Sequence, residues 1–124
     1  MVIAVDFDGT ITDKNIFPEI GKFKEHAIDA LKNLQEHGHK IVLWTCREGA
    51  WLDCARAFLF EKGLQMDGYN YSPYQLQSRK IVADVYIDDK NVFMVDDVDW
   101  YKIEEYILGL GNKKTKIIKG ENDA

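Results

Sequence analysis

Apolar residues along the chain alternate between short continuous runs and runs with helical spacing. The continuous runs at Val2–Val5 and Ile41–Trp44 predict strands that are buried on both faces of a sheet. Two other segments have apolar residues every three or four positions, which is typical of the buried face of a helix. These positions are Ala27, Ile28, Leu31 and Leu34 in the first segment, and Trp51, Leu52, Ala55, Phe58 and Leu59 in the second. The first half of the chain therefore alternates strands with helices.

Glycines follow both predicted helices. Gly38 and Gly63 stand where a helix commonly ends in a left-handed residue. Further along, the sequence predicts short strands and a last helix, which are, in order, Tyr69–Tyr71, Val82–Ile87, Phe93–Val95 and a helix over Trp100, Ile103, Ile107 and Leu110. Strands that alternate with helices indicate a layered α/β domain with a mainly parallel sheet.

Composition limits the size and setting of this domain. A chain of 124 residues with 46% hydrophobic content builds one compact core, so we expect a single domain over residues 1–118 and a flexible tail over 119–124. The net charge of -5 gives no electrostatic signal for nucleic acid or an anionic membrane. Two cysteines are too few for a disulfide framework, and no apolar run approaches the ~20 residues that cross a bilayer. These features predict a cytoplasmic protein.

Chemically active side chains cluster where the predicted strands end. Ligands of open parallel sheets bind outside the carboxyl ends of the strands. The residues there are Asp6 and Asp8 after the first strand, Thr45, Cys46 and Arg47 after the second, and Asp88 and Asp89 after a later one, with Lys80 just upstream of it. Two pairs of carboxylates on one rim repel each other unless a cation lies between them. A hard divalent ion that prefers carboxylate oxygens, most simply Mg2+, fits this set.

Each of these motifs alone also has a purely structural interpretation. An Asp-x-Asp-Gly segment is most often a turn, and Asp-Asp after a strand is often a solvated loop or a helix cap. Their joint occurrence in one order, with a hydroxyl and a lysine between them, favours a functional site.

Four segments together resemble the successive motifs of the haloacid dehalogenase-like superfamily, whose commonest members are Mg2+-dependent phosphatases. The segments are VDFDGTITD, LWTCR, the lysine of SRKIVAD, and VYIDD. The resemblance implies a three-layer Rossmann-like fold over nearly the whole chain. It also implies a set of roles: Asp6 as nucleophile, Asp8 as general acid and base, Thr45 as phosphate-binding hydroxyl, Lys80 as charge stabiliser, and Asp88 and Asp89 as metal support.

The same roles follow from the chemistry of the residues. A carboxylate attacks a phosphate dianion only when cations offset the repulsion between the two negative charges. Attack by Asp6 then gives an aspartyl-phosphate. Asp8, two residues on, is suited to protonate the leaving oxygen. Gly9 permits a sharp turn, so that backbone N–H groups near Phe7 and Asp8 face the phosphate. The candidate substrate-binding positions are Phe7, Gly9, Cys46 and Arg47, and the candidate metal ligands are Asp6, Asp8, Asp88 and Asp89. Successive side chains at a strand end point to opposite sides, so we expect one of Asp88 and Asp89 to touch the metal, and the family resemblance implies that it is Asp89.

Several positions keep two interpretations at this point. Arg47 either grips the phosphate or forms a surface ion pair with Glu48. Cys46 could act as a thiol nucleophile, but no histidine is placed to activate its thiol. We therefore interpret Cys46 as a small packing residue. A second acidic group just before the last helix is explained by helix capping, and it comprises Asp96, Asp97 and Asp99.

The spacing of the motifs leaves no room for an inserted cap domain. Only 34 residues separate Thr10 from Thr45, so we expect a capless, open site with Thr12–Gly21 as the one plausible flap. The partner is then a phosphorylated substrate of unspecified identity, and the oligomeric state is left open. Aromatic side chains that could stack a base or sugar at the rim are Tyr69, Tyr71 and Tyr74, although ordinary core and surface roles are the commoner explanation.

Two other classes of protein are alternatives to an enzyme. A phosphoacceptor domain of the receiver type also gathers acidic residues, a threonine and a lysine around Mg2+, but it carries its acidic pair first and its acceptor aspartate on a middle strand. A non-catalytic phosphate-binding protein on the same scaffold would not need every chemical group that this chain carries.

Overall fold

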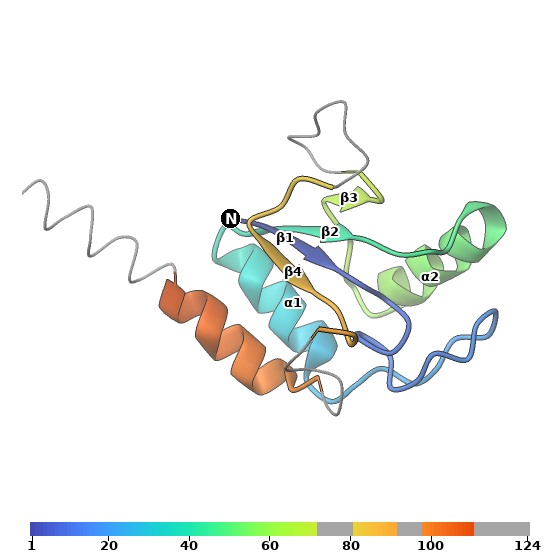
Figure 1. Cartoon of the computed structure of the whole chain (residues 1–124), viewed down its shortest axis with the longest axis horizontal. Coiled ribbons are helices and arrows are strands. Elements are labelled where there is room, and N and C mark those ends of the chain that lie inside the picture. The colour runs from blue at the N-terminus through green and yellow to red at the C-terminus, as the bar shows by residue number, and fades with distance from the viewer. Residues whose placement is uncertain (72–80, 92–97, 111–124) are drawn as a thin grey trace, which may run out of the picture.

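The computed structural model describes residues 1–71, 81–91 and 98–110. Its elements are the strands β1 (Val2–Val5), β2 (Lys40–Leu43), β3 (Gly68–Tyr69) and β4 (Val85–Ile87), the helices α1 (Ala27–Glu36) and α2 (Gly49–Glu61), and a C-terminal helix over residues 100–110. Figure 1 shows the strands side by side and the helices that lie against them. No helix within these described ranges is long and apolar enough to cross a membrane.

The four strands form one parallel sheet in the order β3-β2-β1-β4. β1 lies inside the sheet between β2 and β4. The register pairs Val5 with Leu43 on one side and with Ile87 on the other. The predicted α/β domain with a mainly parallel sheet is therefore confirmed, and the carboxyl ends of β1, β2 and β4 meet at one rim.

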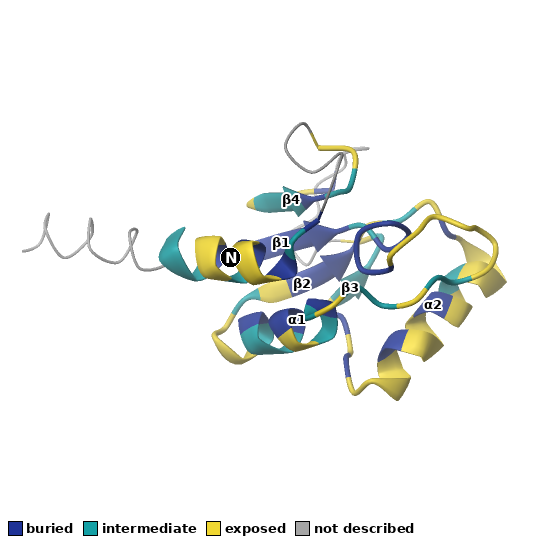
Figure 2. Ribbon diagram, turned by 90° about the horizontal axis from the view of Figure 1, so that it is seen from below, coloured by how far each residue is buried: buried dark blue, intermediate teal, exposed yellow. Residues whose placement is uncertain are grey.

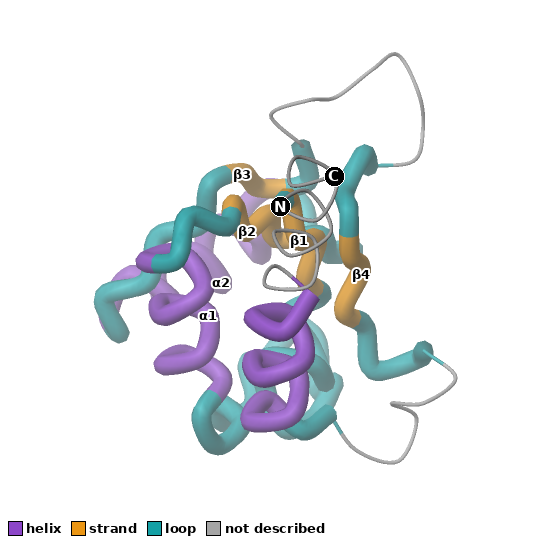
Figure 3. Tube along the Cα trace, turned by 90° about the vertical axis from the view of Figure 1, so that its left-hand side faces the viewer, coloured by secondary structure: helices purple, strands orange, loops and turns teal. Residues whose placement is uncertain are grey.

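Side chains of the sheet alternate between two apolar clusters, as the two-residue period of a strand requires. Ile3 and Val5 face a large cluster to which α1, α2 and the C-terminal helix all contribute. Val2 and Ala4 face a smaller cluster with Val42 and Ile81. Figure 3 shows the helices gathered on one side of the sheet, and Figure 2 shows their buried stripes turned toward it. Among the described residues the second face carries no helix, so the predicted third layer is not part of what the structure describes.

α1 and α2 end just before the predicted glycines. Gly38 and Gly63 have φ of 89° and 77°, in the left-handed region that a side chain disfavours. The following N–H groups turn back to carbonyls of the last helical turn, for example Leu64 N–H to the Leu59 carbonyl at 3.0 Å. This geometry satisfies carbonyls that the helix itself leaves without partners.

Three details of the sequence prediction are corrected by the structure. On α2 only Ala55 and Leu59 are buried, whereas Trp51 is 51% and Phe58 is 44% exposed, so the apolar stripe is narrower than predicted. β3 covers Gly68–Tyr69, and β4 begins at Val85 rather than Val82, because the preceding segment is held by bonds to the Tyr86 hydroxyl. The strand predicted at Phe93–Val95 and the tail over 119–124 lie outside the described residues.

Candidate active site

The parallel pairing of β1 and β4 brings the first acidic group together. The Asp6 N–H donates to the Ile87 carbonyl at 2.9 Å, which continues the ladder one residue past Val5. Asp6 and Asp88 thus leave neighbouring strands at the same level. Carboxylate oxygens of Asp6, Asp88 and Asp89 all lie within 4.8 Å of one another, and all three residues are half-buried. The structure therefore assembles three of the four predicted metal ligands.

Burial and neighbouring charge make this acidic cluster electrostatically costly. Loss of hydration, followed by repulsion from Asp88, raises the pKa of Asp6 from 3.8 to about 7, although the Phe7 N–H and the Thr10 hydroxyl oppose the rise. Burial and the contact with Asp88 also raise the pKa of Asp89, while Lys90 lowers it. Three half-buried carboxylates held this close together are a donor set suited to a hard divalent cation.

Thr10 is a central residue of the site that the sequence analysis did not single out. Its hydroxyl donates to Asp6 Oδ2 at 3.2 Å and accepts the Asp89 N–H at 2.9 Å, so it connects the ends of β1 and β4. Its carbonyl accepts the indole N–H of the buried Trp100 at 2.8 Å. The signal in the sequence is the hydroxyl that directly follows Asp-Gly in the first motif.

The turn after β1 requires glycine for two reasons. Gly9 has φ of 82°, and a Cβ at this position would collide with the carboxylate of Asp89. The Phe7 carbonyl accepts the N–H groups of the next turn, including that of Ile11 at 3.0 Å, and the Gly9 N–H donates to Thr12 Oγ1 at 3.0 Å. The loop therefore closes on itself directly beside Asp89.

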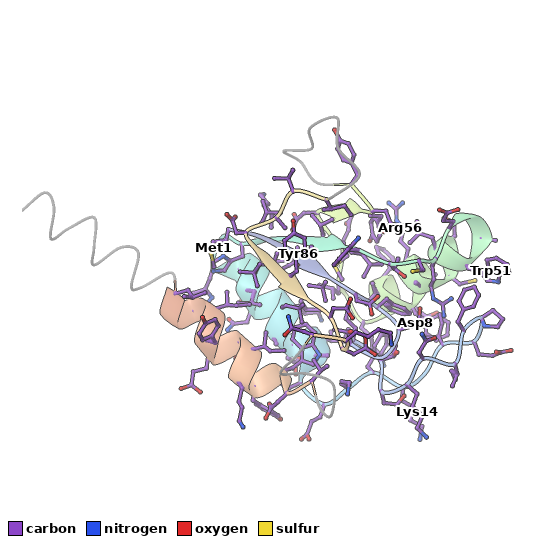
Figure 4. All side chains as sticks on the ribbon, in the orientation of Figure 1. Met1, Asp8, Lys14, Trp51, Arg56 and Tyr86 are labelled. Atoms are coloured by element: carbon purple, nitrogen blue, oxygen red, sulfur yellow. The ribbon has the colours of Figure 1, made fainter. Side chains whose placement is uncertain are left out.

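Asp8 lies apart from the three clustered carboxylates and is bound by Arg47. Arg47 Nε donates to Asp8 Oδ2 at 2.7 Å, and Nη2 donates to Oδ1 at 2.8 Å. Both side chains are buried, Arg47 being 1% and Asp8 8% exposed. The structure gives Arg47 this partner instead of the surface ion pair with Glu48 considered from the sequence. Figure 4 shows Asp8 beyond the end of β1, on the side of the molecule that also carries Trp51 and α2.

The segment after β2 is tied to both the site and β3. Thr45 donates its N–H to Asn70 Oδ1 at 2.8 Å, and its hydroxyl accepts the Arg47 N–H at 3.1 Å. Cys46 is exposed, so its interpretation as a packing residue is wrong.

Other predicted positions fall outside the centre of the site. Lys80 and Tyr74 lie outside the described residues. Tyr69 packs beneath the Arg56 guanidinium at 4.7 Å, and Tyr71 is exposed. Asp99 accepts the N–H groups of the next helix turn, Tyr101 at 3.0 Å among them, which confirms its predicted capping role.

Comparison with known proteins agrees with this fold. The family model of haloacid dehalogenase-like hydrolases matches residues 3–54. A solved structure from Bacteroides thetaiotaomicron, described as that of a conserved protein, is 41% identical and has a TM-score of 0.80. The match covers 88% of this chain and 90% of that chain. No curated protein matches the chain.

The mainly parallel sheet and these similarities together identify the class of protein as a hydrolase. The chain belongs to the haloacid dehalogenase-like hydrolase family. This membership also argues against the receiver-type alternative.

Proposed function

We propose that the protein is a Mg2+-dependent phosphomonoester hydrolase that works through an aspartyl-phosphate on Asp6. The observation that carries the proposal is the convergence of Asp6, Asp88 and Asp89 within 4.8 Å. Such a cluster is costly by itself, as the raised pKa of Asp6 indicates. It is useful to an enzyme that must hold a phosphate dianion beside a carboxylate.

The clustered carboxylates are the residues that would hold Mg2+. When bound, the cation neutralises the charge of the carboxylates and of the substrate phosphate, so that attack on phosphorus becomes possible. Asp8 also belongs to the predicted metal set, but its carboxylate is paired with Arg47 and is not one of the three that lie within 4.8 Å of one another. We therefore assign the side chains of Asp6, Asp88 and Asp89 to the metal.

Asp6 and Asp8 divide the chemistry between them. An Asp6 oxygen attacks phosphorus, the bond from phosphorus to the leaving oxygen breaks, and Asp8 gives its proton to that oxygen. Water then attacks the phosphorus of the aspartyl-phosphate and passes its proton to Asp8, which releases inorganic phosphate and restores Asp6. The Thr10 hydroxyl holds one oxygen of Asp6 during these steps.

The remaining predicted roles belong to the same proposal. Thr45 would donate its hydroxyl to a phosphate oxygen, and Lys80 would offset the charge that develops on the phosphate. The substrate is a phosphorylated compound that enters an open site, because the chain between β1 and β2 contains one loop and α1 alone.

Hydrolysis of p-nitrophenyl phosphate in the presence and absence of Mg2+ tests this function. We expect turnover that EDTA abolishes and Mg2+ restores, and we expect Asp6→Asn to reduce it to background, since an amide does not form the acyl-phosphate. Asp53→Asn, at an exposed position of α2, is the matched control and retains activity. Undiminished turnover without metal, or an active Asp6→Asn variant, would contradict the proposal.

A further inference from the structure

We propose that Arg47 is the positioning residue of Asp8, and that it acts by fastening Asp8 to the loop over residues 12–21. This inference rests on the proposed function, in which Asp8 is the acid and base. It differs from both roles that the sequence suggested for Arg47, which were a grip on phosphate and a surface ion pair.

The first support is the geometry of the contact. Arg47 Nε and Nη2 reach the two different oxygens of Asp8, at 2.7 and 2.8 Å. Two parallel hydrogen bonds from a planar guanidinium fix the carboxylate in position and in rotation, which a single bond does not. A carboxylate oxygen has about two lone-pair sites, so each Asp8 oxygen keeps one for a proton. The contact thus orients Asp8 without blocking its chemistry.

The second support is that the other hydrogen bonds of the guanidinium end on backbone. Nη1 donates to the Pro18 carbonyl at 3.2 Å and to the Trp51 carbonyl at 3.5 Å, and Nη2 donates to the Glu19 carbonyl at 2.8 Å. Arginine has about five side-chain N–H donors, and these bonds together with the two to Asp8 occupy them all. Arg47 therefore has no donor left for a substrate phosphate.

The third support is the packing that holds the guanidinium itself. The Phe7 and Phe17 rings lie 5.4 and 5.1 Å from Arg47 Cζ, and the Phe17 ring stands edge-on against Trp51 at 5.1 Å. Phe7 comes from the turn after β1, Phe17 from the loop over residues 12–21, and Trp51 from α2. Arg47 is thus the point where the proposed acid, the loop and the start of α2 are joined.

The dependence of the reaction on the leaving group tests this role. Phenyl phosphate needs a proton donor more than p-nitrophenyl phosphate does, because phenolate is the poorer leaving group. We expect Arg47→Gln to lower kcat/KM for phenyl phosphate by about tenfold or more beyond its effect on p-nitrophenyl phosphate, as Asp8→Asn does. Arg47→Lys keeps the charge but loses the two parallel bonds, so it should show the same selective loss. Arg56→Gln, which removes an exposed arginine of α2, is the control with an unchanged ratio.

A double-variant cycle keeps the test decisive if Arg47→Gln folds poorly. Asp8→Asn/Arg47→Gln leaves no charge in the buried pair, and it should match Asp8→Asn in kcat/KM for phenyl phosphate. A further loss in the double variant would overturn the positioning role. Arg47→Gln could instead lower kcat/KM equally for both esters and weaken inhibition by inorganic phosphate. That result would show that Arg47 binds phosphate, and it would also overturn the positioning role. If the wild-type protein hydrolyses neither ester, the proposed function itself is wrong, and this role falls with it.

Discussion

The ionisation of Asp6 opposes folding in the metal-free protein, so Asp6→Asn should stabilise it while it abolishes activity. The pKa of Asp6 is 3.8 in an unstructured chain and about 7 in the folded protein, chiefly because of burial and then because of Asp88. The folded protein therefore holds this proton more tightly than the unfolded chain does. As pH rises from about 4 to about 7 the wild-type protein loses stability, and above about 7 the loss is complete. Asparagine carries no charge at any of these pH values and still accepts the Thr10 hydroxyl.

The size of the effect follows from the two pKa values. At ~1.4 kcal/mol for each pKa unit, complete ionisation of Asp6 costs at most ~4 kcal/mol. Because the side chain is partly open to solvent, screening reduces this cost, and we expect a gain of ~2 kcal/mol from Asp6→Asn at pH 8. For a domain of this size such a gain corresponds to a rise in Tm of several degrees.

Urea unfolding in EDTA at pH 5 and pH 8 measures this gain. The free energy of unfolding of Asp6→Asn should exceed that of the wild-type protein at pH 8, and the difference should shrink at pH 5. Saturating Mg2+ should reduce the difference at pH 8, since the cation stabilises only a protein with its carboxylate ligands intact. Asp53→Asn, at an exposed position of α2, should show no such pH-dependent gain. An equal difference at both pH values, or a wild-type protein more stable than Asp6→Asn at pH 8 without metal, would refute the electrostatic reasoning.

Two other predictions concern the turn and the nucleophile. Gly9→Ala should destabilise the protein by ~1–2 kcal/mol and depress turnover, because the residue has positive φ and the new methyl group displaces Asp89. Gly38 has a similar φ of 89°, but the space around a new Cβ is open there. Gly38→Ala should therefore lose stability in urea unfolding without losing activity. Equal activities of Gly9→Ala and Gly38→Ala would exclude the collision with Asp89. Beryllofluoride, which mimics an acyl-phosphate, should bind Asp6 in crystals grown with Mg2+, whereas density on Asp8, Asp88 or Asp89 would assign the nucleophile elsewhere.

Local patterns predicted the strands and helices that carry the site. Val2–Val5 is found as a strand with the predicted bounds, and α1 and α2 end before the predicted glycines. The reason is that buried strands and helix ends are determined by residues that are close in sequence. Patterns are less informative where a distant contact decides the outcome. β4 starts late because the Tyr86 hydroxyl holds the segment before it, and no periodicity records such a bond.

The candidate site shows the same division. The order of the strands brings Asp6, Asp88 and Asp89 together, as the rule for strand ends predicts. The partner of Arg47 was not predictable, because Asp8 is 39 residues away and Glu48 is adjacent in sequence. Trp51 and Phe58 were predicted on the buried face of α2 from their spacing. Spacing identifies an apolar side of a helix, but the width that the sheet covers depends on the packing of the whole domain.

Because β1 lies inside the sheet, catalytic activity requires that the strands on both sides of it have paired. β1, which ends just before Asp6, comes first in the chain, whereas its partner strand β4 comes some eighty residues later. Until β1 pairs with β4, Asp6 has no Asp88 or Asp89 beside it, and the acidic cluster does not exist. A chain that has folded around β1, β2, α1 and α2 would already contain both helices that lie between β1 and β4 in the sequence, but without β4 it would be inert. Under the proposed function, catalysis and the closure of the sheet at β4 should therefore be lost together as denaturant rises.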